Sequence, residues 1–96
     1  MSESKDPAEI ITVTFPYAKE IGGAAIGDPD LSVEIEDGTD AAAAAMLNGA
    51  EQVSGSSVLQ SVRNGVDGVR YKLRCEAPLS DGRRLVRVLS LPVKRR

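Results

Sequence analysis

The chain lacks several residue types on which enzyme sites and disulfide-stapled folds depend. Among its 96 residues there is no histidine and no tryptophan, and there is one cysteine and one phenylalanine. Without histidine, a Ser-His-Asp triad, a Cys-His pair and a histidine-ligated zinc site are excluded, and one cysteine cannot form an internal disulfide. No apolar run approaches the roughly 18–20 residues that span a membrane, and the polar residues 1–7 are unlike a signal peptide. We therefore expect a binding or structural protein rather than an enzyme, with no cofactor and no membrane partner.

What the chain does contain is typical of one small globular domain. Hydrophobic residues make up 42% of the sequence and charged residues 27%, which is ordinary for a folded protein and unlike a disordered one. A chain of this length buries only about 60% of its unfolded surface, so its core is small.

Charge is divided unevenly along the chain. Residues 1–51 contain two basic and eleven acidic residues, a net charge of −9, whereas residues 52–96 contain ten basic and three acidic residues, a net charge of +7. Such a split is compatible with opposed charged faces that guide self-association or the binding of a partner. The alternative is that acidic and basic strands interleave in the fold and their fields largely cancel.

Alternation of apolar and polar residues predicts a series of short strands. We expect strands at residues 10–15, 31–36, 69–77 and 85–93, and one strand within 52–62 after a turn or bulge at Gly55. Residues 17–29 are predicted to be a loop, and the alanine-rich residues 41–47 a short helical turn. In the last strand the apolar positions change phase, which predicts a bulge or burial on both sides.

This spacing of strands, without a βαβ rhythm, favours an all-β sandwich spanning residues 10–96, preceded by a flexible N-terminal arm at residues 1–9. A glycine-rich turn followed by Tyr71 near the start of a strongly alternating strand resembles the F and G strands of immunoglobulin and fibronectin type III domains. That resemblance implies a tyrosine corner at Tyr71, with Cys75 as a small buried hydrophobe. The alternative is a core tyrosine without the corner hydrogen bond.

An ordered set of turn and strand segments runs along the chain: DGTD at 37–40, MLNGA at 46–50, VLQSV at 58–62, GVDGVRYKLRC at 65–75, SDGR at 80–83 and LPV at 91–93. This set is similar to small virion proteins of tailed bacteriophages and prophages, which are often labelled fibre–tail adaptors. The resemblance covers roughly residues 11–93. It implies an immunoglobulin-like domain that is made in the host cytoplasm and built into the virion, at the neck, the tail or the capsid surface.

The leading functional hypothesis is a non-enzymatic virion protein, present in several copies, that docks to other virion proteins in the head–tail or fibre-attachment region. Capsid decoration is the alternative within this class. For the interface, Glu34 and Glu36 are the acidic candidates, and Arg83, Arg84 and Arg87 are the basic ones. Binding of nucleic acid by the basic half is a second alternative, although its basic strand face has no aromatic side chains for stacking and the pI of about 5.1 argues against it.

Overall fold

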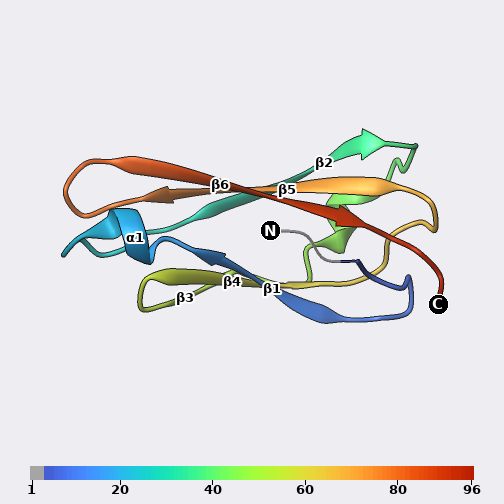
Figure 1. Ribbon diagram of the computed structural model, residues 1–96, viewed down its shortest axis with the longest axis horizontal. Helices are drawn as coiled ribbons and strands as arrows, with labels where there is room; N and C mark the ends of the chain where they lie inside the picture. Colours follow the sequence, from blue (N-terminus) through green and yellow to red (C-terminus); the bar gives the residue numbers. More distant parts are fainter. Residues whose placement is uncertain (1–3) are drawn as a thin grey trace.

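The alternating segments pair into two antiparallel sheets of three strands each in the computed structural model, which describes residues 4–96 (Figure 1). One sheet has the order β1-β4-β3, formed by β1 (Ile11–Pro16), β4 (Ser57–Val62) and β3 (Gln52–Ser54). The other has the order β2-β5-β6, formed by β2 (Asp30–Asp37), β5 (Arg70–Pro78) and β6 (Arg84–Pro92). The two sheets lie face to face, so the predicted all-β sandwich is confirmed.

The strand order is that of an immunoglobulin fold with one strand missing. A constant-type domain has strands A-B-E-D in one sheet and C-F-G in the other. Here β1, β4 and β3 take the places of B, E and D, while β2, β5 and β6 take those of C, F and G. Within residues 4–96 no strand lies beside β1 in the place of strand A, and the N-terminal segment instead makes one parallel bridge between Lys5 and Val93.

The core lies between the two sheets, and period-2 alternation fills it. Inward positions of β5 are fully buried along the strand, and their outward neighbours are not. From the opposite sheet, Val13, Phe15, Val58 and Val62 close the core, and Gln60 is buried among them at 1% exposure. The Gln60 side-chain amide donates to the carbonyls of Gly49 and Ser61, so this polar group is paired.

Three local predictions differ from the structure or are refined by it. The loop expected at 17–29 contains one helical turn, α1 (Ala18–Ile21), and the side chain of Ile21 is buried in the core. The single strand expected within 52–62 is a hairpin, because the turn at Gly55, with φ of +58°, separates β3 from β4. The alanine-rich segment forms the 3₁₀ turn η1 (Ala43–Met46), as predicted for a helical turn there.

The phase change in the last strand has a different cause from the one predicted. Pairing between β5 and β6 runs without a register shift from Pro78 opposite Arg84 to Arg70 opposite Pro92, so there is no bulge. Burial on both sides is not found either, since Val88 is 50% exposed on the outer face. The two valines of that phase, Val86 and Val88, are apolar residues on the outer surface of the sheet.

Residues 4–9, the part of the expected flexible arm that the structure describes, contact the end of β6. Lys5 is fully buried, its backbone N–H donates to the Pro92 carbonyl at 3.0 Å, and its own carbonyl accepts from the Lys94 N–H at 2.8 Å. These residues therefore pack against the end of β6. The expectation of an arm came from the absence of apolar periodicity, whereas the contacts of this segment are made through a buried lysine. Residues 1–3 lie outside the described part of the chain.

Candidate docking surfaces

The outer face of the β2-β5-β6 sheet carries both acidic and basic side chains, and some of them pair with each other. Antiparallel pairing places Glu34 opposite Lys72, and their charged groups lie 3.6 Å apart. Glu36 accepts a hydrogen bond of 2.7 Å from the hydroxyl of Ser90. The two acidic interface candidates therefore point outward, as the alternation predicted, but both contact partners on their own sheet.

The three basic candidates do not form one patch. Arg83 contacts Asp81 at 2.8 Å, and its guanidinium donates to the carbonyls of Glu20 and Ile21, which ties the β5–β6 hairpin to α1. Arg87 pairs with Glu20, and its guanidinium lies 5.0 Å from the centroid of the Tyr17 ring. Arg84 is exposed at the start of β6, opposite Pro78. Two of the three arginines thus hold the fold together at the α1 end of the sandwich.

Tyr71 makes the hydrogen bond that defines a tyrosine corner. Its hydroxyl accepts from the backbone N–H of Val66, five residues upstream, at 2.8 Å, and donates to the carboxylate of Asp40 at 2.7 Å. The second bond is not part of the motif inferred from the sequence, and it connects β5 to the segment before η1. Burial, followed by the bond to Asp40, raises the pKa of Tyr71 to about 12, against an ordinary value of 10.

A second buried tyrosine, Tyr17, lies at the other end of the sandwich, and no sequence motif marks it. The Tyr17 hydroxyl donates to the carbonyl of Cys75 at 3.0 Å, and the ring is fully buried. Burial raises the pKa of the Tyr17 hydroxyl above its usual range. The Cys75 side chain is itself buried, and this burial raises the pKa of its thiol. A protonated, inaccessible thiol has little reactivity, so Cys75 packs as a small apolar side chain.

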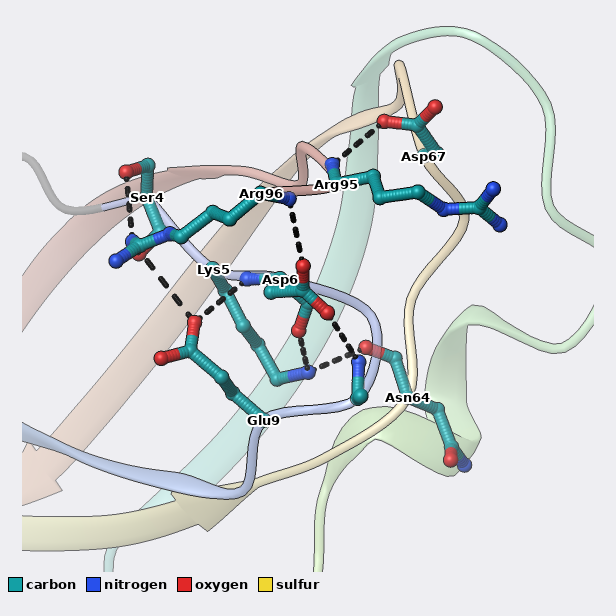
Figure 2. Close-up of polar contacts among 9 residues, drawn as sticks. Ser4, Lys5, Asp6, Glu9, Asn64, Asp67, Arg95 and Arg96 are labelled. Carbon is teal, nitrogen blue, oxygen red and sulfur yellow. Dashed lines mark hydrogen bonds and ion pairs between the residues drawn. The ribbon is translucent and has the colours of Figure 1, made fainter.

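Lys5 connects the N-terminal segment to the loop before β5 (Figure 2). Its ammonium donates to the backbone carbonyl of Asn64 at 2.6 Å and to that of Asp6 at 2.9 Å. Burial lowers the pKa of Lys5, and the nearby carboxylates of Glu9 and Asp6 oppose that effect. The Asp6 carboxylate accepts a hydrogen bond of 2.7 Å from the backbone N–H of Arg96, so the described N-terminal segment meets the C-terminal residues here.

The outer face of the β1-β4-β3 sheet is entirely different, because it carries no charged side chain. Residues 10–18 and 52–62 contain no Asp, Glu, Lys or Arg. A shallow hollow of about 320 Å³ lies over this face, lined by Thr12, Asn48, Ala50, Gln52, Leu59 and Ser61. Its lining offers hydroxyl, amide and apolar groups, and no group suited to acid–base catalysis.

Residues 4–96 contain few other candidate functional features. No group of three or more His, Cys, Asp or Glu side chains is placed to hold a metal ion within residues 4–96. In the same part of the chain, no helix has the length and apolar character needed to cross a membrane. A further hollow of about 340 Å³ lies at the α1 end, lined by Pro16, Ala18, Lys19, Glu20 and Arg87.

One comparison with known proteins identifies the family. The family model described as "Podophage GP4 fiber-tail adaptor protein gp77" matches residues 5–92. The chain belongs to this family. No curated protein and no solved structure matches the chain.

Membership in the fiber-tail adaptor family makes this chain a structural protein of the phage virion, in the region of the tail, that interacts with other virion proteins. The matched residues begin at Lys5 and include every strand of the sandwich.

Proposed function

We propose that this chain is a non-enzymatic connector that binds other virion proteins where fibres attach to the tail. The observation that carries the proposal is the match of the fiber-tail adaptor family over residues 5–92. The structure is consistent with it, since its outward faces offer strand edges and polar surface rather than a cleft with converging titratable groups. Non-covalent docking through such surfaces is a common function of small sandwich domains.

The alternative locations and functions have less support. A neck or capsid-surface position requires the protein to lie away from the fibre attachment that the family description names. Nucleic-acid binding requires a continuous basic face. In the β2-β5-β6 sheet, Lys72 faces Glu34, and the Arg74 guanidinium lies 3.3 Å from the Glu76 carboxylate. These two pairs place acidic groups within the basic strand face that the second half of the sequence suggested, which argues against a continuous basic surface.

Omission of the protein from phage assembly tests the proposal. Particles made without it should have normal heads and tail tubes and should lack fibres, as seen by electron microscopy and by protein composition of purified particles. Adding back the purified chain should restore fibre binding. Fibres present at normal number without the protein would contradict fibre attachment, and empty or tailless particles would assign it to the neck.

A further inference from the structure

The free edge of β1 presents a row of backbone groups that nothing in residues 4–96 pairs with. The Tyr17 N–H donates to the Ser56 carbonyl, so the backbone groups of Tyr17 point towards β4. Ile11, Val13 and Phe15 are separated from Tyr17 by even numbers of positions, so their backbone groups also point towards β4. Because hydrogen-bonded residues alternate along an antiparallel strand, the N–H and C=O groups of Thr12 and Thr14 point to the open edge. The carbonyl of Pro16 points the same way.

The other strand edges of the sandwich carry features that discourage pairing, and β1 does not. Natural edge strands are protected by charge, bulges, proline or shortness. β2 carries four acidic residues and an irregularity between Ile35 and Asp37, and β3 has only three residues. β6 contains two arginines, and Lys5 pairs with its C-terminal end. β1 is six residues long, uncharged and regular, with a proline only at its last position.

We propose that the free edge of β1 pairs antiparallel with β1 of a second copy of this chain, about a two-fold axis at Val13. In this register Thr12 lies opposite Thr14 of the second copy, and the two strands form about six interchain hydrogen bonds. Threonine pairs across antiparallel strands are favourable. Ile10, which is 67% exposed, lies opposite Pro16 of the second copy, so an exposed apolar side chain gains an apolar neighbour.

The charge distribution favours a second copy over a different partner as the occupant. A two-fold axis brings each surface close to an identical surface, so any charge near the axis meets its own sign. Charged interfaces between unlike proteins instead tend to be complementary. Residues 10–18 and 52–62, which form this sheet and its approaches, contain no charge in a chain that is 27% charged. The neutral β1 edge is therefore suited to pairing with the same edge of a second copy.

Charge-swapped variants of the full chain test this register directly. Thr12→Lys/Thr14→Lys and Thr12→Glu/Thr14→Glu each place like charges opposite one another across the axis. Sedimentation equilibrium should show a dimer for the wild type, and each variant alone should dimerise at least about tenfold more weakly. An equimolar mixture of the two variants should recover the dimer, because each Lys then faces a Glu. Gln52→Lys/Ser54→Lys, on the other edge of the same sheet, is the matched control and should dimerise like the wild type.

Amide hydrogen exchange on the wild type gives a readout that needs no variant. Protection of the Thr12 and Thr14 amides should rise with protein concentration, while the Val13 amide, already paired to β4, should not change. A protein that stays monomeric to about millimolar concentration, with fast exchange at Thr12 and Thr14, would overturn the proposal. So would protection of these two amides that appears only when another tail protein is added, since that outcome assigns the edge to a different partner.

Discussion

Replacing Tyr71 by Phe tests the tyrosine corner, because it removes one oxygen atom and two hydrogen bonds while leaving the buried ring in place. The backbone N–H of Val66 and the carboxylate of Asp40 both lose their partner. A neutral hydrogen bond contributes about 1 kcal/mol to the free energy of unfolding, and one to a charged group about 1.5–3 kcal/mol. Asp40 is only half-buried, so water can replace part of its lost bond. We expect a total loss of about 2 kcal/mol.

The two tyrosines provide a matched comparison within one chain. Tyr17→Phe removes a single bond, to the Cys75 carbonyl, and should cost about 1 kcal/mol. In a domain of this size 1 kcal/mol lowers the melting temperature by about 4–8 °C, so Tyr71→Phe should lower it by about 10 °C. Calorimetry and urea unfolding measure both variants. If Tyr71→Phe melted within about 2 °C of the wild type, or lost less stability than Tyr17→Phe, the corner would not be stabilising the fold.

Alkaline titration checks the same hydroxyl independently. The pKa of Tyr71 is raised to about 12 in the folded protein from an ordinary value of 10. Between these values the folded state holds a proton that the unfolded state has released, so stability is fully present below pH 10 and falls as the pH rises towards 12. Tyr71→Phe should fall less steeply across this window than the wild type. Equal slopes, measured by urea unfolding at several pH values, would show that the hydroxyl is not shielded.

Three further predictions concern other parts of the chain. Deleting residues 1–9 should lower the free energy of unfolding by about 2 kcal/mol, because the bridge to β6 is lost; an unchanged urea midpoint would show that this segment is only loosely attached. Gly65→Ala should destabilise by about 1–3 kcal/mol, because φ is +102° and a Cβ would lie 2.8 Å from the Val93 side chain; Gly68→Ala, strained but uncrowded, should cost less. Arg84→Glu should leave the melting temperature unchanged and weaken binding to a tail partner at low salt by about 0.2–1 kcal/mol; salt-independent binding would remove Arg84 from the interface.

Much of the sandwich could be predicted because its signal is local. The outward arginines and lysine of β5 alternate with buried Leu73, Cys75 and Ala77, and a strand with that pattern has only one way to face a core. Tyr71 could be predicted for a similar reason, since its turn, its strand position and its partner Val66 all lie within a few residues of one another.

The features that the sequence did not reveal depend on contacts between distant segments. Lys5 is buried because its ammonium meets the Asn64 carbonyl, 59 residues away, and Tyr17 is paired with Cys75 across 58 residues. Neither contact leaves a periodic trace, and a lysine in a polar segment ordinarily indicates exposure. One nearby sign does exist, because Asn64 has a positive φ of 60° and precedes Gly65, which favours a tightly held turn at this point.

The order of the strands, rather than the composition, determines where the acidic and basic halves of the chain lie relative to each other in the fold. The acidic β2 and the basic β5 are neighbours in one sheet, so Glu34 lies beside Lys72 and the charges of the two halves of the chain largely neutralise each other there. Charged residues lie on that sheet, at the α1 end and where the N-terminal segment meets Arg96, whereas residues 10–18 and 52–62 contain none, so the outer face of β1-β4-β3 is neutral. The same arrangement leaves the place of strand A empty beside an uncharged edge. Several charges on one outer face are therefore paired within their own sheet. The uncharged sheet ends instead at the β1 edge, whose backbone amides and carbonyls have no partner within residues 4–96, and this edge is the one that gains most from a neighbouring strand.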